Sequence, residues 1–324
     1  MKNTETVKFF LQKTDIPYSE NISLKQKTWI KRGGIARLWI QPLSIEQLQL
    51  LCTYLYQHNI FFEIVGHTSN MYFLNTYNPE IVVSIAKLTY YEVSENEIVC
   101  ECGVSISKLT SDLVNQGIEG FEGFISLPGT IAGAVVNNSG CYGSIISSVI
   151  ISVDILLPSG KVRNFKNEEL GYAHRTSFLK TRQINGIVLK CYFQKTISKD
   201  KEVLIVKANK NREHRKKNQE TPDGNLGSTF ANIKLKKTFY TTFVSVFRNI
   251  LKPFVSENKR RKWSYMLLFK LHGKERLFSF VSDKNYNCYL WRKENADGYF
   301  FEYVEFIRQI SPMANLEIEI KGKN

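Results

Sequence analysis

The stretch from Gly123 to Gly143, GFISLPGTIAGAVVNNSGCYG, has the most unusual composition in the 324-residue chain. It contains five glycines among small and polar side chains, and Pro128 precedes the second of them. Each glycine inside a helix costs about 1 kcal/mol relative to alanine, so we do not expect an ordinary helix here. Glycines instead allow turns whose backbone N–H groups approach a flat or phosphorylated ligand. A plain connecting loop is the alternative, because glycine-rich motifs are common.

Length and composition predict a globular protein of two or three domains. Hydrophobic residues make up 43% of the chain, and no apolar run reaches the length of about 18 residues that a membrane span needs. The N-terminal residues lack the apolar region and cleavage site of a signal peptide. The six cysteines are not spaced as a disulfide framework or as metal ligands. We therefore expect a cytoplasmic, monomeric protein without a metal.

The net charge of +14, from 44 Lys and Arg against 30 Asp and Glu, allows three interpretations. They are nucleic-acid binding, attraction of anionic small molecules, and a solvated basic surface. The basic residues are densest at 207–217 and 259–262, and neither run has the interleaved aromatic residues on which bases stack. The charge therefore favours an anionic small molecule, and we expect no nucleic-acid partner.

The run LPGTIAGAVVNNSGCYG at 127–143 resembles the flavin-binding segment of the UDP-N-acetylenolpyruvoylglucosamine reductase family. The usual form of that segment is close to IPGTVGGAVVQNAGAYG. The resemblance implies that the chain binds FAD. The residues that it assigns to the cofactor in this run are Pro128, Gly129, Thr130, Gly133, Ala134, Asn138, Gly140, Tyr142 and Gly143.

Two earlier segments are similar to the same family. The segment from residue 27 onward, KTWIKRGGIARLWIQPLS, is similar to the family opening, and this implies that Arg32 and Gly33 border the cofactor. A solvated strand residue is the alternative for Arg32. The motif GHTSN at 66–70 stands where the family has G-x-G-S-N, whose backbone amides hold the flavin pyrophosphate.

The second motif implies cofactor contacts for Gly66, Ser69 and Asn70. His67 and Thr68 stand where glycines are common in the family. The sequence leaves open whether this turn keeps the left-handed backbone geometry that a glycine would allow.

Three further segments are similar to family motifs that carry catalytic residues. YAHRTSFLK at 172–180 resembles YRxSxFK, GSTFAN at 227–232 resembles GSxFKN, and LEIEIKG at 316–322 resembles LEPEVRxxG. The catalytic residues that these matches assign are Arg175, Ser228 and Glu317. A surface ion pair is the alternative for Arg175, and Glu319 is the alternative to Glu317, since both glutamates could point to one strand face.

The resemblance implies the reduction of UDP-N-acetylglucosamine enolpyruvate to UDP-N-acetylmuramate in peptidoglycan precursor synthesis. NADPH would reduce FAD, and hydride would then pass to C3 of the enolpyruvyl group. Arg175 would pair with the substrate carboxylate, Glu317 would help to stabilise the enol-like intermediate, and Ser228 would donate a proton to C2. The expected contacts of the nucleotide sugar are Arg215, Lys216 and Asn232.

The implied fold is α+β with three domains. Residues 1–84 and 85–206 would form a PCMH-type FAD-binding module, and residues 207–310 would form an α+β substrate-binding domain. The tail, 311–324, would pack back on the first domain. Val203–Val206 is predicted as the last strand of the second domain, and no G-x-G-x-x-G motif of a doubly wound sheet follows a strand.

Residues 234–310 are the part least similar to the family, in which this region surrounds the nucleotide sugar. Two alternatives therefore stay open. One is a flavin-dependent oxidoreductase that acts on another nucleotide sugar in surface-polysaccharide synthesis. The other is a non-catalytic protein that retains the flavin-binding fold.

Overall fold

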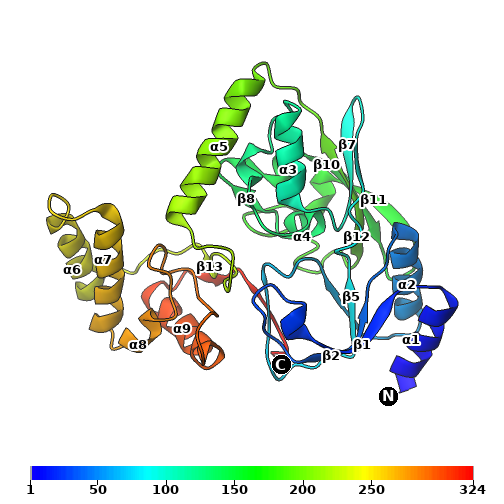
Figure 1. Cartoon of the computed structure of the whole chain (residues 1–324), viewed down its shortest axis with the longest axis horizontal. Helices are drawn as coiled ribbons and strands as arrows, with labels where there is room; N and C mark the ends of the chain where they lie inside the picture. Colours follow the sequence, from blue (N-terminus) through cyan, green and yellow to red (C-terminus); the bar gives the residue numbers. More distant parts are fainter. Residues whose placement is uncertain (1, 324) are drawn as a thin grey trace. The chain divides into compact units, whose positions relative to one another are not determined.

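The computed structural model describes residues 2–323, which divide into two compact units of mixed helices and strands (Figure 1). The first unit contains the residues up to Thr28, Gly33–Ser69 and Asn75–His214. The second contains Trp29–Arg32, Asn70–Leu74 and the residues from Arg215 onward. The α+β class is confirmed. The two predicted flavin subdomains fall mainly in the first unit, and their division from each other stays a prediction.

One sheet of the first unit contains four of the described strands, in the order β1-β2-β5-β3. The strands are β1 (Tyr18–Ser23), β2 (Ile35–Ile40), β3 (Glu63–Val65) and β5 (Ile81–Ser84). β1 is antiparallel to β2, whereas β2 and β3 are both parallel to β5. The motif that begins at Gly66 therefore follows directly from the end of β3.

Two helices bury an apolar stripe in the same hydrophobic cluster as this sheet. They are α1 (Lys2–Lys13) and α2 (Ile45–Gln57). In α2 the buried leucines recur every three or four residues, which is the spacing of one helix face. Ser44 begins this helix, because its Oγ accepts a hydrogen bond from the Gln47 N–H at 3.2 Å.

The other sheet of the first unit contains five of the described strands, all antiparallel, in the order β11-β10-β12-β7-β6. The strands are β6 (Tyr91–Val93), β7 (Glu97–Glu101), β10 (Ile150–Leu156), β11 (Val162–Lys166) and β12 (Ile187–Gln194). α3 (Ile106–Asn115) contributes Leu109 and Leu113 to the cluster that already holds the first sheet. A single hydrophobic core therefore joins both sheets.

The glycine-rich stretch lies on this core through a short helix, α4 (Ile131–Val136), which contacts β7 and β12. The expectation that the stretch contains no ordinary helix is wrong for these six residues. Thr130 begins the helix by accepting a hydrogen bond from the Gly133 N–H at 3.2 Å. Ile131 and Val135 are fully buried, so packing offsets the cost of the single glycine in α4. The short strands β8 (Gly140–Cys141) and β9 (Ser144–Ile145) follow.

The prediction of a strand at Val203–Val206 is wrong, because these residues lie in α5 (Lys201–Asn218). Asp200 Oδ1 accepts hydrogen bonds from the N–H groups of Glu202 and Val203, at 3.0 and 3.1 Å. This local N-terminal cap outweighs the β propensity of the valines. Val203 and Val206 face solvent on the helix, with exposed fractions of 62% and 65%.

The second unit is built mainly from helices, which Figure 1 shows in yellow to red. They are α6 (Phe239–Ile250), α7 (Glu257–Leu271), α8 (Glu275–Phe278) and α9 (Ala296–Ile310). The aromatic residues of α9 pack with Tyr289 and Trp291 in a second hydrophobic cluster. No helix within residues 2–323 is long and apolar enough to cross a membrane.

Two small strand pairs complete the second unit. β13 (Phe230–Ala231) is antiparallel to β14 (Asn315–Leu316). β15 (Glu319–Lys321) is parallel to β4 (Met71–Phe73). The tail therefore pairs with a segment from the N-terminal part of the chain.

Arg32 connects another N-terminal segment to α9 within the second unit. Its Nε lies 2.9 Å from Asp297 Oδ2, and its Nη2 donates to the Trp291 carbonyl at 2.6 Å. Tyr72 OH donates to the other Asp297 oxygen at 2.8 Å. Burial, and then the nearby carboxylate, raise the pKa of Tyr72, which keeps it a hydrogen-bond donor. Asp297 thus holds two N-terminal segments at once.

We expect Asp297→Asn to lower the free energy of unfolding by about 1–3 kcal/mol, because it removes a charged acceptor from a partly buried network. Asp283→Asn is the matched control, since Asp283 pairs with Lys262 with about half of each side chain exposed. That exposed pair is expected to contribute under about 1 kcal/mol. Urea unfolding of both variants measures the difference, and equal losses would show that Asp297 does not join the segments.

Candidate functional site

The two glycine-containing motifs predicted to hold the flavin lie against each other in the first unit. A Cβ atom on Gly66 would lie 2.5 Å from Thr130 Oγ1, far inside contact distance. Ser69 Oγ donates a hydrogen bond to the Pro128 carbonyl at 3.2 Å. Gly129 has φ of +128°, and a Cβ there would lie 3.1 Å from Ser69 Oγ. Glycine therefore leaves room for the Thr130 and Ser69 side chains where the two motifs meet.

Thr68 answers the question that the sequence left open about this turn. Its φ is +54°, so the chain adopts left-handed geometry without a glycine. Such a conformation costs of order 1–3 kcal/mol in a non-glycine residue and persists where the surroundings impose it. Thr68 is 4% exposed, which indicates that its neighbours hold it in place.

His67 is half-buried beside Gly129. Burial lowers the pKa of its imidazole, and a hydrogen bond with the Gly129 backbone acts in the opposite direction. The net shift is downward, so His67 is neutral near pH 7. A neutral imidazole next to Gly129 adds no positive charge to the predicted pyrophosphate site, and His67 contacts the backbone instead.

The middle of the glycine-rich stretch is packed into the protein. Gly133 uses its N–H to cap α4, and Ala134 is buried in the main cluster. Gly33 has φ of +124°, and its N–H donates to Asn75 Oδ1 at 3.1 Å. For these residues the structure provides a packing reason, and direct cofactor contacts stay predictions.

A cavity of about 330 Å³ opens at the end of the glycine-rich stretch. It brings the predicted flavin residues Gly140, Tyr142 and Gly143 together with the predicted catalytic Arg175. Gly143 has φ of +86°, and no heavy atom of the described residues lies within 4 Å of its Cβ position. Tyr142 lies in the turn between β8 and β9. Its OH lies 3.3 Å from His214 Nδ1, which connects this turn to α5.

Cys141 and His174 also line this cavity, and sequence analysis missed both. His174 directly precedes Arg175, and Cys141 lies inside the glycine-rich stretch. Their places next to predicted site residues could have indicated both. Neither residue type matches the family pattern there, which is why the resemblance did not select them.

The Arg175 segment is attached to the glycine-rich stretch at two points. Asn138 Nδ2 donates to the Ala173 carbonyl at 2.9 Å, and Ser177 Oγ donates to the Val136 carbonyl at 2.7 Å. Asn138 and Ser177 are almost fully buried. Arg175 itself has φ of +59°. These bonds hold Arg175 at the cavity, and they give Asn138 a positioning role whose cofactor contact stays a prediction.

A second group of predicted residues meets inside the second unit. The Glu317 N–H donates to the Thr229 carbonyl at 2.9 Å, next to Ser228. Asn70 Nδ2 donates to the Glu317 carbonyl at 3.1 Å. Ser228 is exposed and follows Gly227, which has φ of +76°. The structure thus brings Ser228, Glu317 and Asn70 together from three distant parts of the sequence.

The expectation that Glu317 and Glu319 point to one strand face is wrong. β14 ends at Leu316 and pairs with β13, whereas β15 begins at Glu319 and pairs with β4. The chain changes its partner strand between the two glutamates. Glu319 Oε1 lies 2.6 Å from Lys321 Nζ, while Glu317 lies beside Thr229.

The residues expected to contact the nucleotide sugar also belong to the second unit. Arg215 Nη1 donates to Gln219 Oε1 at 2.9 Å, and the Lys216 carbonyl accepts from Lys284 Nζ at 3.1 Å. Asn232 is exposed with φ of +57°. Arg32, predicted near the cofactor, is bonded to Asp297 as described above. Sugar and cofactor contacts of these side chains stay predictions.

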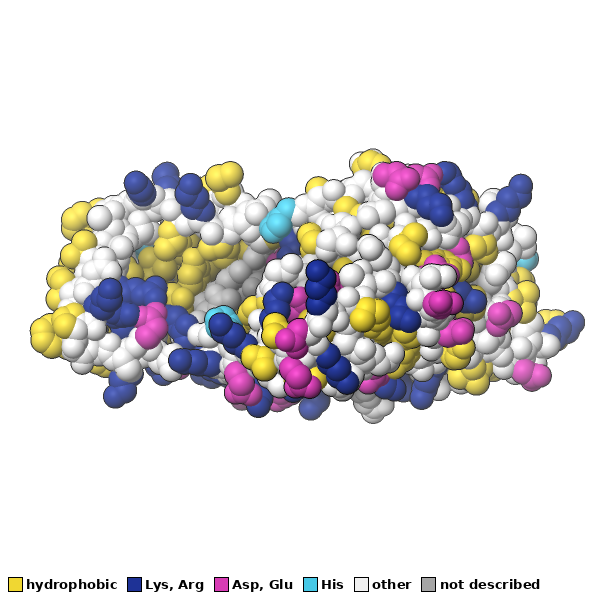
Figure 2. All heavy atoms as spheres, turned by 90° about the horizontal axis from the view of Figure 1, so that it is seen from above, with side chains coloured by type: hydrophobic (Ala, Val, Ile, Leu, Met, Phe, Trp, Pro, Cys, Tyr) yellow, Lys and Arg dark blue, Asp and Glu magenta, His cyan; other side chains and the backbone are white. Residues whose placement is uncertain are grey.

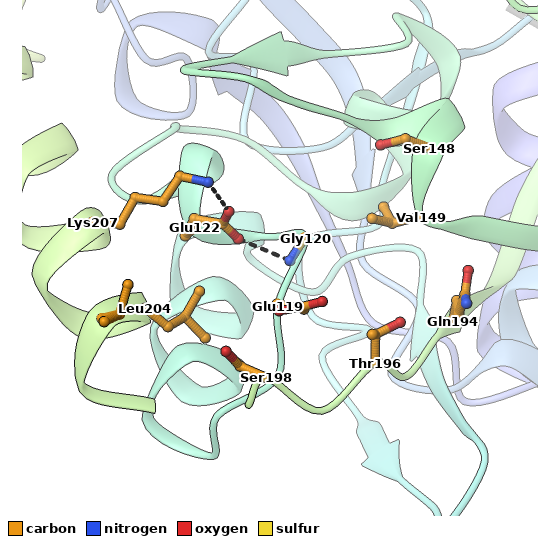
Figure 3. Close-up of a pocket in the computed structure, with 11 residues that line it drawn as sticks. Glu119, Gly120, Glu122, Ser148, Val149, Gln194, Thr196, Ser198, Leu204 and Lys207 are labelled. Atoms are coloured by element: carbon orange, nitrogen blue, oxygen red, sulfur yellow. Dashed lines mark hydrogen bonds and ion pairs between the residues drawn. The ribbon is translucent and has the colours of Figure 1, made fainter. Parts of the chain in front are cut away.

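A larger cavity, of about 450 Å³, lies between α5 and the start of the glycine-rich stretch (Figure 3). Glu122 and Lys207 point toward each other in it, 2.6 Å apart, and the Gly120 N–H donates to Glu122 at 2.8 Å. Burial alone would raise the pKa of Glu122, but the hydrogen bond from Lys207 and those from backbone N–H groups outweigh it and lower the pKa. Sequence analysis missed this pair, which attaches α5 to the stretch.

Gly66→Ala is expected to lower both the melting temperature and the retained flavin, because its Cβ would push the two motifs apart. Gly298→Ala is the matched control, since Gly298 lies in α9 and a Cβ there meets no heavy atom of the described residues within 4 Å. The control is expected to keep its flavin and to gain up to about 1 kcal/mol of stability. Thermal unfolding and the flavin-to-protein absorbance ratio measure both effects. Full flavin in the Gly66 variant would contradict the close approach.

The donor set of the first unit fits a flavin dinucleotide. The two glycine-containing motifs meet where Gly66 leaves room for the Thr130 side chain, and hydroxyl groups of Ser69 and Thr130 lie at the junction. The open cavity at Gly143 lies farther along the same stretch. Turns that offer backbone N–H and hydroxyl groups bind phosphate groups, while an open pocket suits a flat ring system.

Comparisons with known proteins agree with this geometry. The family described as FAD binding domain matches residues 36–166, which include the glycine-rich stretch. The UDP-N-acetylenolpyruvoylglucosamine reductase of Bacillus pumilus is 32% identical over 214 residues, which are 66% of this chain and 70% of that protein. The enzyme of the same name from a Nostoc species is 30% identical over 227 residues, or 69% of this chain and 68% of that protein.

The solved structure of UDP-N-acetylenolpyruvylglucosamine reductase from Thermus caldophilus has the same fold. It superposes with a TM-score of 0.67 and 19% identity, over 94% of this chain and 98% of that one. The family match and the relatives identify FAD as the cofactor and the protein as an oxidoreductase. The chain therefore belongs to the UDP-N-acetylenolpyruvoylglucosamine reductase family.

Proposed function

We propose that the protein reduces UDP-N-acetylglucosamine enolpyruvate to UDP-N-acetylmuramate, with NADPH as the reductant, as a step of peptidoglycan precursor synthesis. The relatives are named for reduction of this class of substrate. The observation within the chain that best supports the proposal is the backbone contact between Glu317 and Thr229. It brings the backbone of the tail glutamate that matches the family motif next to the segment that carries Ser228.

FAD, when bound, supplies the hydride for this reduction, and NADPH supplies the electrons that restore it. In the first unit, Gly66, Ser69 and Thr130 would hold the phosphate groups of the cofactor. Gly140 and Gly143 would allow its ring system to lie close to the backbone. Because Gly140 and Gly143 carry no Cβ, the protein would approach the ring system through its main chain.

Arg175 binds the substrate carboxylate in this proposal. Its guanidinium offers two parallel N–H donors that match the two oxygens of a carboxylate. The bonds from Asn138 and Ser177 that hold the Arg175 segment support this role, because an oriented cation stabilises the charge that builds on the carboxylate during the reaction. A positioned donor loses little entropy when the substrate binds.

Ser228 gives its hydroxyl proton to C2 of the substrate in this proposal, and Glu317 shares a hydrogen bond with the enol. A serine hydroxyl is a weak acid, so the proton transfer needs a strongly basic carbon at close range. The left-handed Gly227 and the exposure of Ser228 leave the hydroxyl accessible. Thr229 and Asn70 hold the Glu317 backbone from both sides, which supports a fixed place for its carboxyl group.

Anaerobic absorbance spectra test the proposal and the role of Ser228 together. NADPH is expected to bleach the flavin bands of the purified protein, and UDP-N-acetylglucosamine enolpyruvate is expected to restore them. Ser228→Ala should keep the bleaching but slow the restoration about 10²- to 10⁴-fold, since it removes the proton donor. Ser245→Ala, at an exposed serine of α6, is the control.

Two outcomes would contradict the proposal in different ways. Flavin bands that bleach with NADPH but do not return in the wild-type protein would indicate another nucleotide sugar as substrate. A Ser228→Ala variant that restores its bands at the wild-type rate would rule out this serine as the proton donor.

The two glutamates of the tail can be compared directly. We expect Glu317→Gln to slow the restoration of the flavin bands by the substrate more than their bleaching by NADPH, because its carboxyl group acts in the second half-reaction only. Glu319→Gln is the matched control, since Glu319 pairs with Lys321 within β15. Stopped-flow absorbance separates the two halves. Equal slowing of both halves by Glu317→Gln would instead indicate a folding role, and slowing by Glu319→Gln alone would reverse the assignment.

A further inference from the structure

The α6 helix exposes a continuous apolar stripe. Phe239, Phe243, Val246 and Ile250 are spaced by four, three and four residues, so they lie along one face. Their exposed fractions are 80%, 47%, 50% and 62%. Of the twelve residues of α6, all of which the structure describes, Val244 alone is buried. A helix of a globular protein normally turns such a stripe toward the core, whereas α6 turns it to solvent.

The loop that follows α6 continues this surface. Phe254 lies four residues after Ile250, in the turn before α7, and is 82% exposed. It and Phe239 have the highest exposed fractions among the large hydrophobic side chains of the described residues. We call Phe239, Phe243, Val246, Ile250 and Phe254 the apolar stripe.

α6 is a well-formed helix and not a poorly folded segment. Thr238 begins it with a reciprocal cap, in which its Oγ1 accepts from the Thr241 N–H at 3.2 Å and its N–H donates to Thr241 Oγ1 at 2.9 Å. Tyr240 contacts His272 edge to face, with ring centroids 5.1 Å apart, and Arg248 pairs with Glu257. These contacts connect both ends of α6 to α7, and Figure 1 shows the two helices side by side.

The α6–α7 hairpin and the residues that flank it carry most of the net positive charge of the chain. Residues 234–274 contain eleven Lys and Arg and a single acidic residue, Glu257, for a net charge of +10 out of +14 in the whole chain. Arg248 and Arg260 both pair with Glu257, which neutralises its charge. Figure 2 shows the outcome at the left, where yellow and dark-blue side chains intermix over α6 and α7 with little magenta.

Lysines stand at both ends of the apolar stripe. Lys236 and Lys237 precede Phe239, and Lys252 lies between Ile250 and Phe254; all three are exposed. Lys259 and Lys262 on α7 are exposed as well. An apolar helix face bordered by lysines is the pattern of helices that lie in the interface of an anionic bilayer, with the apolar side chains among the acyl chains and the lysines at the headgroups.

The charge distinguishes between occupants of this surface. A second copy of the chain would bring a net charge of +10 against another +10, which disfavours self-association through the stripe. Single-stranded nucleic acid would stack on aromatic rings, but Val246 and Ile250 in the middle of the stripe offer none. Anionic lipids match both features of this surface. Their acyl chains supply an apolar phase for the stripe, and their negative headgroups attract the lysines.

We propose that the α6–α7 hairpin binds the surface of an anionic membrane, through insertion of the apolar stripe and attraction of the surrounding lysines. This surface is distinct from the residues assigned to the flavin and to catalysis. The protein would thus associate with the membrane reversibly, without a spanning segment. Long exposed side chains at both ends of the hairpin let it enter the interface without rearranging the core of the second unit.

Vesicle co-sedimentation of the full-length holoprotein tests the proposal. The protein is expected to sediment with vesicles of phosphatidylcholine and phosphatidylglycerol but not with vesicles of phosphatidylcholine alone. Raising the salt concentration should weaken the binding, because salt screens charges over about 10 Å at 0.1 M. No sedimentation with the anionic vesicles at low salt would overturn the proposal.

Two variants separate the apolar and the charged contributions. A Phe239→Ser, Phe243→Ser and Ile250→Ser triple variant should bind the anionic vesicles roughly tenfold more weakly or worse, since each lost side chain removes buried apolar area. A Lys236→Gln, Lys237→Gln and Lys252→Gln triple variant should lose the preference for phosphatidylglycerol. Phe61→Ser is the control, because Phe61 is 71% exposed outside the hairpin. Flavin content and melting temperature check that each variant is folded.

Three results would contradict the membrane surface. Undiminished vesicle binding by the folded apolar variant would show that the stripe does not insert. Concentration-dependent dimerisation in analytical ultracentrifugation, lost in the apolar variant and without vesicle binding, would indicate a second copy as the occupant. A salt-sensitive shift with RNA, again without vesicle binding, would indicate nucleic acid.

Discussion

The close approach of Gly66 to Thr130 is the constraint on which the flavin-binding unit depends. A side chain at Gly66 would overlap the threonine that begins α4, and α4 is the part of the glycine-rich stretch that packs on the main core. The contact therefore connects the end of strand β3 in one sheet to a helix lying on the other sheet. Glycine is needed at that point because the Thr130 side chain occupies the place of its Cβ, and glycine turns also suit a phosphorylated cofactor.

Several residues in the segments assigned to function have a left-handed backbone conformation. Thr68, Asn138, Tyr142, Arg175 and Asn232 all have positive φ, although none is a glycine. Each such residue costs free energy that the surrounding contacts must offset, as the two buried hydrogen bonds do for the Arg175 segment. In return, left-handed residues aim side chains and N–H groups in directions that regular strands and helices do not provide.

The part of the chain least similar to its family is also the part with the most distinctive surface. Residues 234–310 include α6 and α7, where an apolar stripe and an excess of lysine and arginine coincide. Flavin binding does not require such a surface, and the buried face of the hairpin would tolerate a polar exterior. The flavin-binding unit and the α6–α7 hairpin therefore have different physical requirements. The flavin-binding unit needs closely packed motifs, whereas the hairpin presents a surface suited to a partner outside the chain.

The sequence by itself determined the α+β class and the flavin motifs, because these depend on residue types and their spacing within short segments of the chain. Only the tertiary structure decided that Thr68 is left-handed and that Glu317 and Glu319 do not share a strand. It also decided that the apolar face of α6 points outward. Contacts between residues far apart in the chain decide which strands pair, which side chains are exposed and which φ angles are imposed. The local spacing of residues does not predict those contacts.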